Sequence, residues 1–310
     1  MACARLRSLG LDIGSLPTGK FNAITDVAGV TVGYFTLICD VPQIVRTGIT
    51  AIWPRGAETW SDYVFAGAFS FNGNGEMTGL PWIAEQGLLG APIGITNTYQ
   101  VGMVRDAICA LAVRDGTPQD FHLPVVAETY DGWLSDIQSF PLTIEHAFAA
   151  FDSAIGGGPI AEGHVGGGTG MICHEFKGGT GTASRLVMEN EAHYTVGALV
   201  QANYGLRETL RIDGVPVGHE IGPEVVPAHT LGERQLGRTR AVRLSSCSRL
   251  MRLFSPSSAN VWRGGRPPDL PGLVVLAPTA AATCSLPSRR LTTLGLTRRS
   301  RTSACWPPLP

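Results

Sequence analysis

The sequence predicts an α+β protein in which sheets and helices pack in layers. Its strand-like and helix-like segments come in mixed order rather than in strict β-α-β alternation, which disfavours a doubly wound parallel sheet. The 39 glycines mostly punctuate apolar stretches, as in FAGAFSFNGNGEMTGL (65–80), where they permit tight turns and close backbone approach. The chain of 310 residues is 44% hydrophobic and 16% charged, so it has ample apolar material for a core.

Five segments have the composition and spacing of β-strands. The first, FNAITDVAGVTVGYF (21–35), is predicted to form two short strands with a glycine turn between them. Short apolar runs rich in β-branched residues predict the other four, TGITAIW (47–53), APIGITNT (91–98), LPVVAETY (123–130) and HYTVGALVQAN (193–203). Both 123–130 and 193–203 turn polar where they end.

Two further segments show helical spacing, and one has the signature of a hairpin. Apolar residues recur every three or four positions along 98–114, and Thr98 is the predicted N-cap. The second helix covers 143–154, with Thr143 as its predicted N-cap. In LRIDGVPV (210–217) the central Asp-Gly pair is typical of a two-residue β-hairpin turn.

Charge and composition argue against several classes of function. A formal net charge of −1 gives no reason to expect nucleic acid or an anionic membrane as a partner. No apolar run approaches the roughly 18 residues that a membrane helix needs, and the start, MACARLRSLGLDIG, lacks the apolar core of a secretory signal. The seven cysteines are scattered and include no C-x-x-C pair. We therefore expect a cytoplasmic protein.

The chain changes character near residue 240. Residues 1–240 hold 14 Lys and Arg against 24 Asp and Glu, a net charge of −10. Residues 241–310 hold ten Arg, no Lys and a single acid, Asp269, a net charge of +9. No strand or helical period remains there beyond PGLVVLAP (271–278). This composition predicts a folded domain over 1–240 and a disordered or poorly packed tail over 241–310.

Residues 166–185, GGGTGMICHEFKGGTGTASR, place two glycine clusters around a run of reactive side chains. A phosphate loop would need G-x-x-x-x-G-K-[ST] or G-x-G-x-x-G between a strand and a helix, and this stretch fits neither pattern well. A metal site would use Cys173, His174 and Glu175, but adjacent strand residues point to opposite faces and cannot ligate one ion. The remaining interpretation is a tight backbone bend beneath a pocket, with Cys173 as a buried small hydrophobe.

This stretch and four other regions share long motifs with one enzyme family. The segments are NAITDVAGVTVGY (22–34), VRTGITAIWPRG (45–56), FNGNGEMTGLPWIAEQGLLGAPIGITNTYQVG (71–102), VVAETYDGWLSD (125–136) with VQANYG (200–205), and GTGMICHEFKGGTGTASR (168–185). They resemble the DmpA-type aminopeptidases, the family of L-aminopeptidase/D-esterases and β-aminopeptidases. The similarity runs from about residue 8 to about residue 240.

The resemblance implies a four-layer αββα sandwich similar to the N-terminal-nucleophile hydrolases. A precursor of this family cleaves itself before a serine about four-fifths along the chain, and the freed amine and hydroxyl then serve as base and nucleophile. Its substrates would be peptides, or amino-acid amides and esters, with a free N-terminal amine. The resemblance implies no metal and no cofactor, and it suggests a homo-oligomer.

Three positions match the functional residues of that family. Glu128 matches the acid that anchors the substrate ammonium, where a carboxylate gives charge-assisted recognition of a free amine. Tyr130 and Asn203 match the pair that binds the tetrahedral oxyanion, each donor being worth on the order of 3 kcal/mol in the transition state. From the residues alone, Glu128 and Tyr130 could equally be surface residues after a strand, and Asn203 a turn residue.

The nucleophile expected near residue 242 is absent. By the resemblance, the chain should resume there with Ser, an apolar run and Ala-Thr-Asp-Ala-Pro, and no such pattern follows residue 240. A one-nucleotide shift of the reading frame can restore it, since Val242–Leu250 can then give Ser-Thr-Leu-Leu-Val-Leu-Ala-Thr. In the same frame Thr279–Ser288 can give Gly-Ser-Gly-Asp-Leu-Phe-Ile-Ala-Phe, with the second serine and an acid near 281–283. We therefore hypothesise that everything after roughly 240 is translated out of frame.

Three functions remain open at this point. The first is a self-processing serine aminopeptidase that is inactive as written, because the nucleophile segment is lost. The second is an N-acyltransferase of related fold, although those enzymes use threonine where the restored frame offers serine. The third is a non-catalytic pseudoenzyme subunit that assembles with active copies.

Overall fold

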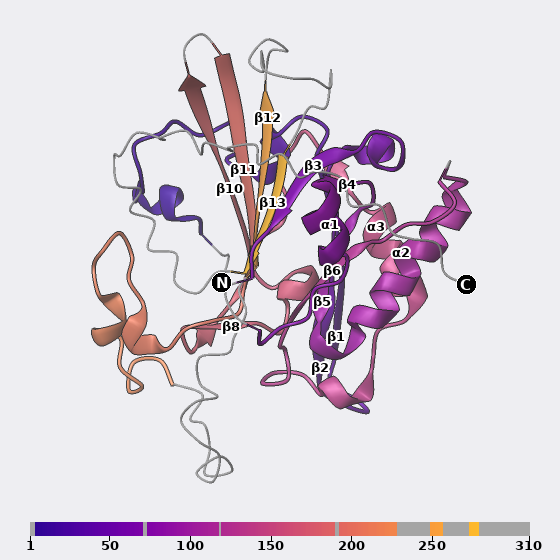
Figure 1. Ribbon diagram of the computed structural model, residues 1–310. Coiled ribbons are helices and arrows are strands. Elements are labelled where there is room, and N and C mark those ends of the chain that lie inside the picture. The colour runs from indigo at the N-terminus through magenta and orange to yellow at the C-terminus, as the bar shows by residue number, and fades with distance from the viewer. Residues whose placement is uncertain are drawn as a thin grey trace, which may run out of the picture.

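Two β-sheets lie face to face, and two helices cover the outer face of one of them, as the computed structural model in Figure 1 shows. The structure describes residues 4–70, 73–117, 119–189, 192–227, 249–256 and 273–278. The observed architecture is the layered α+β arrangement that the mixed order of elements predicts.

The first sheet has the strand order β6-β5-β2-β1-β7. Its strands are β1 (Thr31–Cys39), β2 (Val45–Trp53), β5 (Ile93–Asn97), β6 (Val125–Thr129) and β7 (Ile155–Gly156). β5 and β6 run parallel, so their carboxyl ends lie side by side, while the other neighbours in this sheet are antiparallel.

The second sheet has the strand order β10-β11-β12-β13-β3-β4. Its strands are β10 (Gly179–Glu189), β11 (Ala192–Ala202), β12 (Arg249–Pro256), β13 (Leu273–Pro278), β3 (Val64–Ala68) and β4 (Leu88–Leu89). A separate small hairpin joins β8 (Ile172–Cys173) to β9 (Phe176–Lys177). β10 and β11 pair in register over their full length.

The helices are α1 (Leu80–Gln86), α2 (Val101–Asp115) and α3 (Ile144–Asp152). Shorter 3-10 turns lie at Leu6–Leu9, Ile24–Asp26, Gly56–Trp60, Thr98–Gln100, Ile137–Ser139, Gly166–Gly168, Arg207–Thr209 and Val217–His219. Within the described residues, no helix is both long and apolar enough to cross a bilayer.

The core has two layers, one on each face of the first sheet. Between the sheets pack the side chains of Val32, Ile52, Ile93, Val125 and Leu199 with their neighbours. Between the first sheet and helices α2 and α3 lies a second apolar cluster, which includes Ile49, Trp53, Ile108, Leu111 and Phe151. Because both faces of this sheet are covered, almost every residue of its central strand β2 is buried.

Most of the predicted elements are confirmed. Strands β2, β5, β6 and β11 coincide with the four short apolar runs, and α2 and α3 coincide with the two helical patterns. The pair Asp213-Gly214 forms the predicted turn, with positive φ at both residues and a bridge between Ile212 and Val215.

Two local predictions are wrong for identifiable reasons. Residues 21–28 form a 3-10 turn rather than a strand, because the Asp26 carboxylate accepts the backbone N–H groups of Phe21 and Ala23. Thr98 does not cap α2. Asn97 instead accepts the N–H groups of Tyr99 and Gln100, while the Thr98 hydroxyl donates to Glu128.

The αββα expectation is met for three of its layers. Helices α2 and α3 and the two sheets are present, and a second helical layer is not among the elements in the described ranges. Two segments after residue 240 are strands, β12 and β13, and β13 coincides with the run at 271–278. The rest of 241–310 lies outside the described residues, so the predicted tail stays a prediction.

The glycines at 166–168 pack against strands of both sheets. A Cβ at Gly166 would lie 2.6 Å from the Thr50 hydroxyl, and its φ of +54° is itself unfavourable for other residues. A Cβ at Gly167 would lie 2.6 Å from Oε1 of Gln201 on the opposite sheet. The backbone at these glycines therefore passes through a space that is too narrow for side chains.

We expect Gly167→Ala to lower the free energy of unfolding by about 2 kcal/mol, because the added methyl group would also lie 2.8 Å from the Ile95 carbonyl oxygen. Urea unfolding measures the change. Gly102→Ala is the matched control, since nothing lies within 4 Å of its Cβ position in α2, and it should stabilise by up to about 1 kcal/mol. Equal effects at the two positions would contradict the packing account.

Candidate functional site

Glu128 lies near the carboxyl end of β6 and is almost completely buried, with 4% of its surface exposed. Its Oε2 accepts a 2.5 Å hydrogen bond from the Thr98 hydroxyl, at the end of the neighbouring parallel strand β5. Its backbone N–H donates to the carbonyl oxygen of Glu76. A buried carboxylate at such an edge is a suitable anchor for a cation.

Tyr130 and Asn203 are brought together, but through the backbone of Tyr130. The Asn203 side chain accepts the Tyr130 N–H through Oδ1 at 2.9 Å and donates to the Tyr130 carbonyl oxygen from Nδ2 at 3.1 Å. Asn203 follows β11 in the second sheet, and Tyr130 follows β6 in the first, so this amide joins the two sheets. Asn203 is 3% exposed.

The two donors predicted to bind an oxyanion, the Asn203 amide and the Tyr130 hydroxyl, differ in their surroundings. The Nδ2 of Asn203 already has two acceptors, the carbonyl oxygens of Tyr130 and Ile172, the latter at a longer 3.3 Å. Donation to an oxyanion would therefore share or replace the Ile172 contact. The Tyr130 ring is half-exposed and makes an edge contact with Trp133, and burial raises the pKa of its hydroxyl, so the group stays a neutral donor.

The structure adds one residue that the sequence motifs did not single out. Asp131 is 1% exposed, and neither of its carboxyl oxygens has a hydrogen-bond partner of normal geometry among the described residues. Burial raises the pKa of Asp131 to about 6, the Thr47 hydroxyl opposes this shift, and the charge of Glu128 adds to it. Its position within the DG dipeptide after a strand is typical of an exposed turn, so no local pattern indicates this burial.

The Cys-His-Glu run forms a turn. His174 and Glu175 have φ of +51° and +65° and connect β8 to β9, so they are not strand residues as the opposite-face argument assumed. His174 is buried, with Nδ1 2.9 Å from the Leu206 carbonyl oxygen. Burial raises the pKa of Cys173 to about 11, which keeps its thiol protonated. No group of potential metal ligands is found within the described residues.

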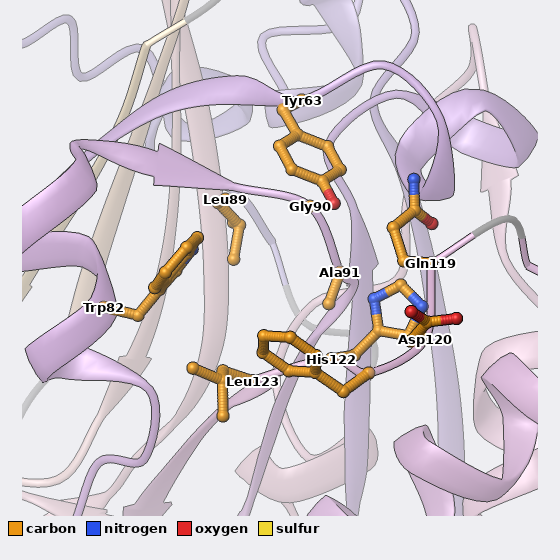
Figure 2. Close-up of a pocket in the computed structure, with 10 residues that line it drawn as sticks. Tyr63, Trp82, Leu89, Gly90, Ala91, Gln119, Asp120, His122 and Leu123 are labelled. Carbon is orange, nitrogen blue, oxygen red and sulfur yellow. The ribbon is translucent and has the colours of Figure 1, made fainter.

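A pocket of about 420 Å³ lies away from these residues, next to the amino ends of the parallel strands β5 and β6 (Figure 2). Its walls include Tyr63, Trp82, Phe121 and Leu123. Burial lowers the pKa of His122 in this pocket, and its Nε2 lies 2.8 Å from the Thr117 hydroxyl, so the ring is neutral and held in place. None of Glu128, Tyr130 and Asn203 lines it.

The serine expected near 242, and the second serine and acid expected near 281–283, all lie outside the described residues. The described part of the site is therefore the edge formed by the ends of β6 and β11.

Known proteins resemble the chain over most of its length. The model of peptidase family S58 matches residues 22–280. Two curated relatives are named beta-peptidyl aminopeptidase BapA. The one from Sphingosinicella microcystinivorans is 49% identical over 229 residues, which is 72% of this chain and 57% of the relative. The one from Sphingosinicella xenopeptidilytica is 47% identical over 230 residues, 71% of this chain and 56% of the relative.

Two solved structures have similar folds. A beta-aminopeptidase from Burkholderia sp. matches with a TM-score of 0.67 and 51% identity, covering 70% of this chain and 62% of its own. The L-aminopeptidase D-Ala-esterase/amidase from Ochrobactrum anthropi, described as a variant of the Ntn-hydrolase fold, matches with a TM-score of 0.69 and 37% identity, covering 89% and 78%. The chain thus has an Ntn-hydrolase-like fold, and it spans somewhat over half the length of the curated relatives.

We expect Asn203→Ala to lower the free energy of unfolding by about 3 kcal/mol, since it leaves the N–H and carbonyl oxygen of Tyr130 without their partners. Urea unfolding measures the change, and near-ultraviolet circular dichroism reports on the Tyr130–Trp133 pair. Gln138→Ala, at an exposed position, serves as the control and should stay within about 0.5 kcal/mol of the parent. A small change in the free energy of unfolding of Asn203→Ala would mean that this amide is not needed to hold the two sheets together.

We also expect Asp131 to make stability depend on pH. Its folded-state pKa of about 6 lies above its ordinary value of 3.8, so between these pH values the folded state binds more protons than the unfolded state. The free energy of unfolding should therefore fall by about 3 kcal/mol as pH rises from about 4 to about 7. As pH rises from about 4 to about 7, the free energy of unfolding of Asp131→Asn should therefore increase by this amount relative to that of the parent. The exposed Asp106→Asn should show no such trend.

Proposed function

Because the chain belongs to peptidase family S58, we propose that it derives from a self-processing serine aminopeptidase of the N-terminal-nucleophile type. The observation that supports this proposal is the contact between the Asn203 side chain and the Tyr130 backbone, two residues after Glu128, at the ends of one strand from each sheet. Asn203 lies beside the end of β6 although 75 positions separate it from Glu128 in the sequence.

Glu128 is proposed to hold the ammonium group of the substrate. The supporting feature is its burial, because a carboxylate shielded from water binds a cation more strongly than an exposed one does. Thr98 holds one carboxylate oxygen in place. A site that requires a free ammonium group limits the enzyme to the N-terminal residue of a peptide.

Tyr130 and Asn203 are proposed to stabilise the oxyanion of the tetrahedral intermediate. A neutral phenol and an amide N–H are suitable donors, and the clamp between the Asn203 side chain and the Tyr130 backbone fixes their relative position before the reaction. The serine and its own α-amino group would supply the nucleophile and the base, without metal or cofactor.

The substrates are proposed to be peptides, amides or esters that carry an N-terminal β-amino acid. The relatives at 49% and 47% identity are named beta-peptidyl aminopeptidases, whereas the match named an L-aminopeptidase D-Ala-esterase/amidase is 37% identical. We also propose that the complete protein assembles as a homo-oligomer and has the second helical layer of an αββα sandwich.

The chain as written is proposed to lack activity, because residues after roughly 240 read out of frame and remove the nucleophile. The alternative with a specific observation in its favour is a non-catalytic subunit, since the Ser and Ala-Thr-Asp-Ala-Pro pattern is absent from 241–310. The nucleotide sequence around codon 240 separates a true coding change from an error.

The test compares this chain with one whose frame is restored after codon 240. On a denaturing gel, the chain as written should give one band and release no p-nitroaniline from β-alanyl p-nitroanilide, whereas the restored chain should give two bands and release product. Glu128→Gln in the restored chain should lower kcat/KM by about 10- to 100-fold through loss of the charged contact. Glu85→Gln, at an exposed position on α1, is the matched control and should leave kcat/KM unchanged.

Cleavage and product release by the chain as written would refute the frame hypothesis and leave the peptidase assignment standing. A restored chain that folds but neither cleaves itself nor releases product would refute the peptidase assignment.

A further inference from the structure

Two carboxyl side chains are buried within four residues of each other at the end of β6. Glu128 is 4% exposed and Asp131 is 1% exposed. The Glu128 carboxylate accepts a hydrogen bond from the Thr98 hydroxyl. The Asp131 carboxyl has no hydrogen-bond or ion-pair partner of normal geometry in the part of the chain that the structure describes. Burial disfavours the charged form of a carboxyl group, and the charge of Glu128 adds to this effect at Asp131, so Asp131 is the better place for a proton.

The surroundings hold Asp131 in place. A Cβ at Gly170 would lie 2.7 Å from the Cβ of Asp131, so this loop packs directly against it. The carbonyl oxygen of Asp131 accepts the N–H groups of Leu134 and Ser135, and the Asn203 side chain fixes the preceding residue. The carboxyl group is therefore held in a buried position.

Among the described residues, the charged and ionisable groups around this carboxyl are few. Glu128 on β6 is the charge that acts on Asp131, while Tyr130 and, through it, Tyr99 in the 3-10 turn before α2 are the neighbouring phenols. β2 presents the Thr47 hydroxyl, and the guanidinium of Arg46 on that strand is directed to Asp40 and the Cys39 carbonyl oxygen instead. The loop that contains Gly170 contributes no side chain at this residue.

We propose that Asp131 is a positioning residue of the amine site, and that it releases its proton to the solvent when an ammonium group binds at Glu128. This inference rests on the proposed function, because it takes Glu128 as the ammonium anchor. In the free protein the protonated Asp131 adds no charge of its own beside Glu128. A bound ammonium group places a positive charge near both carboxyl groups, and this charge stabilises the ionised form of Asp131.

Proton release links the affinity for amines to pH. The pKa of Asp131, about 6 in the free protein, falls when a positive charge occupies the site. Amine binding therefore tightens as pH rises from 5 to 7, by up to about tenfold when the bound cation lowers this pKa to well below 5. A residue that only fills space would leave the affinity independent of pH.

The experiment uses isothermal titration calorimetry of the full chain with β-alaninamide, which stays protonated from pH 5 to pH 7. At pH 6, titrations in phosphate and in imidazole count the protons released, and about half a proton per amide is expected. The dissociation constant should fall by roughly tenfold from pH 5 to pH 7 in the parent chain. Asp131→Asn should release no proton and show a much weaker trend, while Asp106→Asn should behave as the parent.

Glu128→Gln keeps failure of this inference apart from failure of the proposed function. If Glu128→Gln weakens binding but the parent and Asp131→Asn share one pH dependence, the ammonium anchor stands and the proton linkage is overturned. If the parent binds no β-alaninamide, this inference is overturned, while the proposed function is decided by the restored chain. Should Asp131→Asn fail to fold, carbon NMR of the Asp131 carboxyl in the parent decides, because an unchanged titration midpoint on saturation with the amide overturns the proposal.

Discussion

The side-chain amide of Asn203 is the contact on which the arrangement of this site depends. It joins the end of β11 to the end of β6 by bonding both the N–H and the carbonyl oxygen of Tyr130. Two residues earlier, Gln201 is fully buried and bonds Thr50 and Thr129 of the first sheet. Around these contacts the described part of the interface holds a large apolar cluster, whose packing is not directional and would tolerate small sliding movements. These directional bonds fix the register of one sheet against the other, and thereby the place of every group at that edge.

The glycines at 166–168 and 170 make those polar contacts possible. They run between the sheets with their missing side chains facing Thr50, Gln201, Thr180 and the Arg46 carbonyl oxygen. The absence of a side chain at Gly167 leaves room for Gln201 to reach Thr50 and Thr129. Gly170 likewise allows its loop to pack directly against Asp131, which is almost completely buried.

Local sequence patterns predict most strands and both long helices, because their apolar residues face one of two continuous cores. They fail where a side chain forms a local bond, as Asp26 does in its turn and Asn97 does at the start of α2. Family motifs select Glu128, Tyr130 and Asn203, but not the direction of the Asn203 bonds or the burial of Asp131. Both depend on two distant segments meeting, and no local pattern encodes that. Strand β10 was missed because its glycines resemble a loop.

The order of strands in the second sheet bears on how the chain reaches this structure. β12 and β13, the last of the described strands to leave the ribosome, lie in the middle of that sheet, between β11 and β3. Until they arrive, β11 and β3 each present an open edge, and the earlier strands exist as two separate half-sheets. Completion of the sheet is therefore a late, long-range event during synthesis, and such open edges invite pairing with other nascent chains. A change in the last third of the gene thus acts on the centre of the fold.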